Sequence, residues 1–217
     1  GVSSEAGLDH RAMRICFEEL RRAQEISPRP NFLILLGNRY GWRPLPEDIS
    51  VREFGELEGI ALAESAEHAE ILRSWYRRDD NAVPPVYILQ SRRQDLADGK
   101  HYTEDEHWNK IQVVLWEIIN RVMPPERMRG RFDGARKPND PPPQIIRFQA
   151  SATEQEIWQG ALRVPDAKEH VLVFFREIAE IGAVKDPTRI KDFVDVSPSG
   201  GIDTGLHAEQ ERLKRHL

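Results

Sequence analysis

The chain has 217 residues, of which 39% are hydrophobic and 31% are charged, and its net charge is −5. This is the composition of an ordinary globular domain, and the acidic balance argues against a dedicated nucleic-acid binder. A single cysteine, Cys16, excludes a disulfide framework and a cysteine-based zinc site. No segment reaches the roughly 18 apolar residues of a membrane span, and the cysteine content fits a reducing compartment, so we expect a cytoplasmic protein.

The chain opens with a helix that leads into a strongly apolar strand. Apolar residues recur at helical spacing from Ala12 to Ala23, and Asp9 is placed to cap this helix. The run Phe32 to Leu36 predicts a strand buried on both faces, as in parallel sheets that are covered by helices. A parallel sheet is not expected to begin with a helix. We therefore expect the sheet to be truncated at its N-terminus, with its first strands upstream of Gly1.

Helices and strands alternate through the middle of the chain. Ser50-x-x-Glu53 and Thr103-x-x-Glu106 are capping-box signatures that predict two helix starts. A further helix is predicted over 64–77 and a strand over 86–90. The helix after Thr103 has the clearest amphipathic stripe of the chain. Its apolar positions are Trp108, Ile111, Leu115, Ile118 and Val122.

The stretch 127–144 is rich in proline, glycine and arginine and predicts a loop or linker with solvated charges, Arg131 among them. It separates the main α/β part, 1–126, from a strand-helix-strand part, 145–217, that would connect toward a downstream domain. In this last part we predict strands over 145–148, 171–175 and 193–196. Two overlapping capping boxes, Ser151-x-x-Glu154 and Thr153-x-x-Glu156, are candidates to open the helix between the first two strands, and a helix from about His207 ends the chain. The predicted fold is a three-layer α/β domain with a mostly parallel sheet.

A polar and aromatic cluster follows the first buried strand: Asn38, Arg39, Tyr40 and Trp42. The carboxyl edge of an open α/β sheet is where ligands and partners bind, because strand ends and loops meet there. Arg39 could bind a carboxylate or phosphate while the rings stack on a nucleotide-like ligand. Alternatively, the rings plug the sheet edge and Arg39 pairs with an acidic neighbour. Further along the chain, Trp75 and Asn81 are candidates for the same partner-binding edge.

Complete catalytic signatures are missing from the sequence. There is no GxxxxGK[ST] phosphate loop and no HExxH, and no histidine pair has the spacing of metal ligands, so we predict no metal site. Helix glutamates are the remaining enzymatic groups, because a carboxylate could stabilise an oxocarbenium ion in nicotinamide-ribose cleavage. Glu18 and Glu19 are also explained by an exposed helix face, and Glu154 and Glu156 by helix capping.

Four segments, in order along nearly the whole chain, resemble the region before the NTPase in NACHT and WD-repeat domain proteins. They are RAMRICFEELRRAQEISPRPNFLILLGNRYGWRPLP, SWYRRDDNAVPPVYILQ, TEQEIWQGA and VLVFFREI. The resemblance implies an N-terminal domain of unknown function with a TIR-like, flavodoxin-like sheet. It also implies a downstream NACHT module of a signal-transduction (STAND) NTPase, followed by WD repeats. ATP and Mg²⁺ are expected only in that downstream domain, and no cofactor is expected in this chain.

We therefore expect a signalling or interaction module that acts through protein–protein assembly. The expected partners are its own downstream NACHT-type domain and further copies of the protein, and neither a membrane nor a nucleic acid is expected. The alternative is a TIR-like effector enzyme that cleaves NAD or another nucleotide with a helix glutamate. Glu47, Glu53, Glu56 and Glu58 follow the strand and loop, but none matches the TIR pattern, so no catalytic residue is assigned. A third interpretation is a fragment without independent function.

Overall fold

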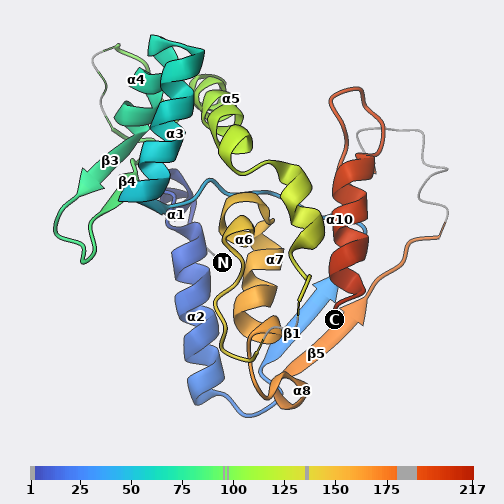
Figure 1. Cartoon of the computed structure of the whole chain (residues 1–217). Helices are drawn as coiled ribbons and strands as arrows, with labels where there is room; N and C mark the ends of the chain where they lie inside the picture. Colours follow the sequence, from blue (N-terminus) through green and yellow to red (C-terminus); the bar gives the residue numbers. More distant parts are fainter. Residues whose placement is uncertain (1–2, 95, 97, 135–136, 180–189) are drawn as a thin grey trace. The chain divides into compact units, whose positions relative to one another are not determined.

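The computed structural model describes residues 3–94, 96, 98–134, 137–179 and 190–217 (Figure 1). The chain divides into two compact units. The first unit comprises Gly1–Cys16 and Pro44–Arg127, and the second comprises Phe17–Arg43 and Met128–Leu217. Residues 17–43 thus belong with the C-terminal part of the chain, because long-range contacts rather than chain order define each unit.

The first unit contains a small antiparallel sheet with strand order β2-β4-β3. The strands are β2 (Asp48–Ser50), β3 (Tyr76–Asp79) and β4 (Val86–Leu89). The helices are α1 (Ser4–Leu8), the start of α2 (Ala12–Ile26), α3 (Val51–Glu64), α4 (Ala66–Trp75) and α5 (Asp105–Val122). Leu57, Leu72 and Leu115, one from each of α3, α4 and α5, are fully buried, so these helices share one core.

The two predicted capping boxes have different outcomes. The Ser50 Oγ accepts a hydrogen bond from the Glu53 backbone N–H at 3.2 Å, and the Glu53 Oε2 accepts one from the Ser50 backbone N–H at 2.7 Å. This box is confirmed and opens α3. The box at Thr103 is wrong, because α5 begins at Asp105 with Glu104 as its N-cap and has no side-chain cap. Its first turn contains two acidic residues, Asp105 and Glu106, whose negative charges interact favourably with the positive end of the helix dipole.

The second unit contains a parallel sheet of two strands, β1 (Phe32–Leu36) and β5 (Val171–Phe175), with Ile34 opposite Val173. The end of α2 belongs to this unit. Its other helical segments are α6 (Gln144–Gln149), α7 (Ala152–Ile157), the π-helical turn η2 (Trp158–Leu162), α8 (Ala167–His170) and α10 (Thr204–Lys214). The 3₁₀ turn η1 (Pro125–Gly130) spans the boundary between the units in the sequence. In the part of the chain that the structure describes, every helix is too short or too polar to cross a bilayer.

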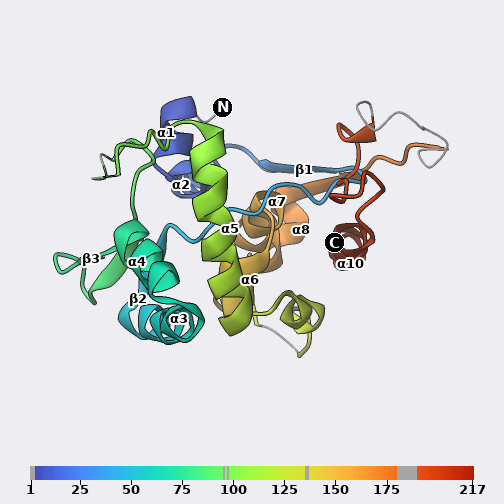
Figure 2. The ribbon, with the colours of Figure 1, turned by 90° about the horizontal axis from the view of Figure 1, so that it is seen from above.

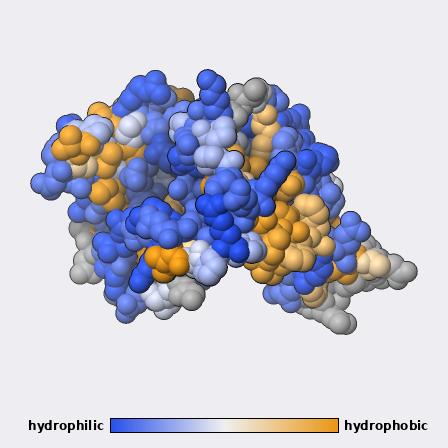
Figure 3. Space-filling view, turned by 90° about the horizontal axis from the view of Figure 1, so that it is seen from below, coloured by the Kyte–Doolittle hydropathy of each residue, from blue (hydrophilic) through white to orange (hydrophobic). Residues whose placement is uncertain are grey.

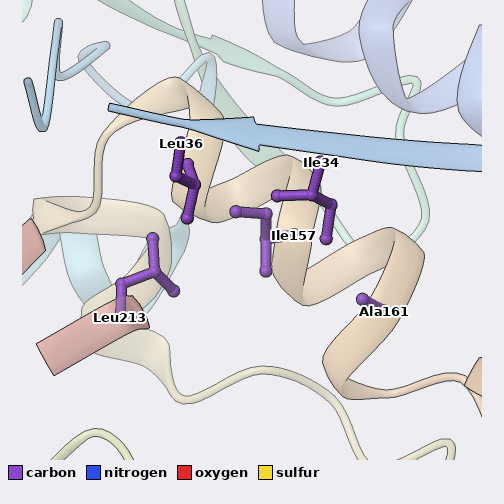
Figure 4. Close-up of a cluster of buried hydrophobic side chains, with 5 residues drawn as sticks. All are labelled: Ile34, Leu36, Ile157, Ala161 and Leu213. Atoms are coloured by element: carbon purple, nitrogen blue, oxygen red, sulfur yellow. The ribbon is translucent and has the colours of Figure 1, made fainter. Parts of the chain in front are cut away.

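The core of the second unit lies on one side of the parallel sheet (Figures 2 and 4). Ile34 and Leu36 of β1 pack against Ile157 and Ala161, and Leu213 of α10 completes the cluster. The turn η2 lies very close to β1, because a side chain at Gly160 would meet the ring of Phe32 at 2.7 Å. Glycine is therefore required at this point of helix-to-strand contact.

The mixed α/β class is confirmed, but the described strands form two small sheets in place of one mostly parallel, three-layer sheet. The prediction that Phe32–Leu36 is buried on both faces is wrong, because Leu33 and Leu35 are exposed. The predicted strand 145–148 is also wrong, since these residues lie in α6 after Pro143. An apolar run this short does not by itself distinguish a strand from a helix. Over 193–196, only isolated bridges at Val194 and Val196 form.

Neighbouring positions of β1 allow a direct test of this one-sided packing. Ile34→Ala should lower the free energy of unfolding by about 2–5 kcal/mol, because it leaves a cavity in the core. Leu35→Ala should change it by about 0.5 kcal/mol or less, because this side chain is already in water. Urea unfolding of the two variants measures the difference. Equal losses would contradict the described packing.

Candidate functional site

The loop at the carboxyl end of β1 is held by one carboxylate, that of Asp195. Its Oδ2 accepts a hydrogen bond from the Tyr40 backbone N–H at 2.6 Å, and both of its oxygens lie 3.3 Å from the backbone nitrogen of Gly41. The Nε of Arg39 lies 3.6 Å from Oδ1. Gly41 has a φ of +93°, a conformation that favours glycine. The chain therefore turns sharply here and is fixed to the segment that contains Asp195.

Directly beside this loop lies a buried polar network centred on Glu154 of α7. Glu154 is completely buried, and its Oε2 accepts a hydrogen bond from the Tyr40 hydroxyl at 2.6 Å. The guanidinium of Arg131 donates to both carboxylate oxygens, with Nε at 2.5 Å from Oε1 and the second contact at 3.2 Å. The Trp158 indole donates to Oε1 at 3.2 Å. The two-contact arginine–carboxylate geometry is the strong form of this pair.

Arg131 extends the network to α10. Its guanidinium also donates to the Glu209 carboxylate and to the backbone oxygens of Met128 and Glu209, and it lies 4.5 Å from the Phe132 ring centroid. Burial alone would lower the pKa of Arg131, but the charge and hydrogen bond of Glu154 raise it overall. Arg131 therefore stays charged in the interior, where it links α7 to α10.

The local sequence explains how α7 presents Glu154. Ser151 is the N-cap of α7, and its Oγ accepts a hydrogen bond from the Glu154 backbone N–H at 3.2 Å, so the serine half of the predicted capping box is confirmed. The side chain of Glu154 is free to turn inward because Ser151 serves the cap. The Tyr40 hydroxyl meanwhile accepts from the Ser151 backbone N–H at 3.3 Å.

The network is suited to holding the second unit together rather than to proton transfer. Burial, together with the negative charge of Glu154, raises the pKa of Tyr40 well above its usual value of 10. The Tyr40 hydroxyl therefore stays protonated and donating at neutral pH. Of the four suggested helix glutamates, Glu154 is the one that belongs to this network. Its carboxylate oxygens already accept hydrogen bonds from Tyr40, Arg131 and Trp158.

The predicted binding-edge residues fall into two groups. Asn38, Arg39, Tyr40 and Trp42 lie in the second unit, where Asn38 forms a bridge to Val194 and Trp42 is exposed. Arg39 pairs with Asp195 and Tyr40 is buried, as the structural interpretation of this cluster expected. A role in ligand or partner binding stays a prediction for this group.

Trp75 and Asn81 belong to the first unit. Trp75 is buried, with its ring centroid 5.0 Å from that of Tyr102 and 4.9 Å from that of Trp108. Asn81 lies in the turn after β3, where its backbone N–H donates to the Asp79 carboxylate at 2.9 Å. A role in partner binding stays a prediction for these two residues as well.

Sequence reasoning missed the partners that form the network. Arg131 was expected to be solvated because it lies in a proline- and glycine-rich stretch, but its side chain is buried. Glu154 was explained by capping alone. Asp195 and Glu209 lie far from Tyr40 in sequence, and no local pattern marks them. Within the described ranges, no group of three or more histidine, cysteine, aspartate or glutamate side chains could hold a metal ion.

The second notable surface is the exposed side of the β1–β5 sheet. Leu33 pairs with Leu172 and Leu35 with Phe174, and their exposed fractions are 55%, 47%, 69% and 53%, respectively. We call these four residues the open sheet face. Figure 3 shows that the face of the molecule seen from below carries hydrophobic side chains, drawn in orange, among hydrophilic ones. Exposed apolar patches of this kind mark interaction surfaces.

Comparison with known proteins places these features in context. The whole chain is similar to the N-terminal region of NACHT and WD-repeat proteins. It is 36% identical over 218 residues to mouse NACHT domain- and WD repeat-containing protein 1, and 25% identical over 218 residues to the human protein of that name. Both alignments cover 100% of this chain and 13% of the relative. Mouse NACHT and WD repeat domain-containing protein 2 is 24% identical over 204 residues, which are 90% of this chain and 11% of that protein.

The chain thus spans about an eighth of the length of these relatives. No protein-family profile matches it, and no solved structure matches it. The likeness supports the resemblance that the sequence motifs indicated, but it assigns no domain type and no activity.

Removing one side of the buried pair should destabilise the protein strongly. Arg131→Met should lower the free energy of unfolding by about 3–5 kcal/mol, because it leaves the Glu154 charge buried and unpaired. Adding Glu154→Gln to this variant should recover part of the loss, since the amide can still accept from Tyr40. Arg22→Ala, at an exposed ion pair on α2, is the control and should be nearly neutral. Urea unfolding measures the wild type, Arg131→Met, Glu154→Gln, the double variant and Arg22→Ala. A double variant whose loss equals the sum of the two single losses would contradict the coupling.

The Tyr40 hydroxyl should make stability sensitive to alkaline pH. Its pKa is raised in the folded protein, so its contribution is complete below the unfolded pKa of about 10 and is lost as pH rises toward the folded value. Raising the pH from about 9 to about 11 should therefore destabilise the wild-type protein more than Tyr40→Phe. Thermal unfolding at each pH tests this, and equal losses in the two proteins would argue against a role of Tyr40.

Proposed function

We propose that the chain is an interaction module of a longer polypeptide of the NACHT and WD-repeat type. It works in signalling, through the assembly of neighbouring copies. The single observation that supports this function is the open sheet face, where four large apolar side chains stand in water on paired strands. The similarity over the whole chain to the N-terminal region of such proteins supports the architectural part of the proposal.

Burial of the open sheet face would release substantial free energy. Parallel sheets are normally covered on both faces, because their strands are apolar on both sides. Complete burial of one leucine or phenylalanine side chain contributes about 1.5–3 kcal/mol. Even partial burial of Leu33, Leu35, Leu172 and Phe174 would therefore yield several kcal/mol toward association.

The occupant that we propose is a second copy of the same module. The open sheet face consists of leucine and phenylalanine side chains and carries no charge of its own, so it is complementary to itself. Self-complementarity is the requirement of a two-fold contact, in which the same patch is used by both subunits. The other possible occupant is a helical layer of the same polypeptide, which would complete a three-layer, TIR-like sheet.

In the parent polypeptide, this contact would bring copies of a downstream NACHT-type domain close together. ATP and Mg²⁺ would bind in that domain, and the partners of this chain would be that domain and the neighbouring module. We place this assembly in the cytoplasm, without contact with a membrane or with nucleic acid. The downstream NACHT-type domain is supported by the names of the relatives, of which this chain covers only a part. The cytoplasmic location is an expectation from the amino-acid composition.

Cleavage of NAD or another nucleotide is the alternative function that the sequence left open. The burial and pairing of Glu154 favour a structural role for this glutamate. Glu18 and Glu19 are exposed on α2, as the interpretation of an exposed helix face expected. This activity stays a prediction.

Sedimentation velocity of the 217-residue chain tests the assembly directly. From about 1 to about 100 μM, a range that spans moderate affinities, the wild type should shift toward a dimer. The double variant Leu35→Asp/Phe174→Asp should remain a monomer, because two charges would be buried in the contact. Leu62→Asp is the matched control, since Leu62 of α3 is 53% exposed, and it should associate like the wild type.

Two results would overturn the proposal. A wild-type chain that remains monomeric over the whole range would contradict a contact between two copies of the open sheet face. Association that is equal in the double variant and in Leu62→Asp would mean that another surface is responsible.

A further inference from the structure

A histidine occupies the joint between α1 and α2 in the first unit, at a position that suits glycine. α1 ends in a Schellman motif, in which the Arg11 backbone N–H donates to the Ala6 carbonyl at 2.9 Å and the His10 N–H donates to the Gly7 carbonyl at 3.2 Å. His10 has a φ of +57°, in the left-handed region. Glycine is the usual residue here, because a side chain is strained in this conformation. The backbone therefore does not explain why the residue is a histidine.

The ring of His10 lies against the aromatic core of the first unit. Its centroid is 4.9 Å from that of Trp108 in α5, at an interplanar angle of 39°. Trp108 is itself buried. Within the part of the chain that the structure describes, the Nε2 atom of His10 is buried and has no hydrogen-bond partner. The ring thus fills an apolar place with one nitrogen unserved.

An arginine faces the same aromatic ring. The guanidinium of Arg92, in the segment after β4, lies 5.3 Å from the Trp108 ring centroid. It donates to the Asp105 carboxylate of α5 at 2.8 Å, so this acidic group is already paired. The Arg92 backbone N–H donates to the Leu8 carbonyl at 2.9 Å, which holds the end of α1 beside this segment. A positive charge on His10 would be repelled by Arg92.

The carboxylate that precedes His10 in the chain is engaged by other groups. Asp9 accepts a hydrogen bond from the Ser91 hydroxyl at 2.6 Å and forms an ion pair with Arg93. Burial, and to a smaller extent the charge of Arg92, lower the pKa of His10 from 6.5 to about 4, and the charge of Asp9 opposes them only in part. His10 is therefore neutral in the folded protein at neutral pH. In water the same ring would have its ordinary pKa of about 6.5.

We propose that the contact between His10 and Trp108 is an acid-sensitive latch, the His10 latch, which holds α1 against α5 while the ring is neutral and releases α1 when the ring is protonated. A protonated ring carries an N–H on both nitrogens, and among the described residues Nε2 has no acceptor. Release brings the ring into water, away from Arg92, and uncovers the indole of Trp108. The His10 latch belongs to the first unit, whereas the open sheet face belongs to the second.

The direction of the pH dependence follows from the two environments of the ring. Because the pKa of His10 is lowered in the folded protein, the released form of α1 binds the proton more tightly. The docked form is fully favoured above a pH of about 6.5 and loses ground as the pH falls toward about 4, where the docked ring is protonated too. Between pH 7 and pH 5, the ratio of docked to released α1 should fall by about tenfold or more.

Hydrogen–deuterium exchange of the 217-residue chain at about pH 7 and about pH 5, corrected for the intrinsic pH dependence of exchange, tests the His10 latch. The amides of residues 4–11 should lose about tenfold of their protection at the lower pH, while α3 should keep its protection. His10→Asn should remove this response, because asparagine does not titrate and tolerates the left-handed backbone. His10→Phe should remove it as well, and this variant keeps an aromatic ring for Trp108.

His207→Asn is the matched control, since His207 is an exposed histidine of α10, and it should respond to pH like the wild type. Three results would contradict the His10 latch. One is equal protection of residues 4–11 at both pH values in the wild type. Another is an undiminished response in the two His10 variants. The third is an equal loss of protection in α3, which would mean that acid unfolds the whole first unit.

Discussion

The second unit depends on one buried carboxylate. This carboxylate, on Glu154, accepts hydrogen bonds from the hydroxyl of Tyr40 in the loop after β1 and from the guanidinium of Arg131 in the segment after η1. Arg131 in turn binds Glu209 of α10. Four segments of the chain are thus joined through a network whose central pair, Arg131 and Glu154, is fully buried. A buried ion pair adds little net stability over an apolar cluster, but it tolerates only one arrangement of its partners, because each unpaired group is costly.

The same packing determines which side of the parallel sheet can interact with partners. The Glu154 network and the core around Ile157 hold α7 and α10 against the Ile34 side of β1. The opposite side, with Leu35, has no such cover in the described chain. A sheet whose strands are apolar on both sides is therefore presented with one face in water. That constraint, rather than any catalytic geometry, connects the fold to the proposed assembly.

Local signals in the sequence were reliable where neighbouring residues decide the outcome. The capping box at Ser50 was predictable because its partner, Glu53, lies three residues away, and the strand at Val86 because its own apolar residues follow a proline pair. The helix at 144–149 was not, since four successive residues rich in isoleucine and phenylalanine fit either a strand or a helix. At the site, the pairing of Arg39 and the burial of Tyr40 were anticipated as one of two interpretations. The partners Arg131 and Asp195 were not, because 91 residues separate Tyr40 from Arg131 and 155 separate it from Asp195.

The sequence by itself determined the mixed α/β class, the helix starts after Ser50 and Ser151 and the likeness to NACHT and WD-repeat proteins, because these depend on local patterns and on ordered motifs. Only the tertiary structure decided that Arg131 lies in the interior, that Leu35 lies in water and that the ring of His10 lies against Trp108. Burial depends on which distant segments pack together, and a residue's own neighbours in the chain do not specify it. The open sheet face and the His10 latch are both consequences of such packing.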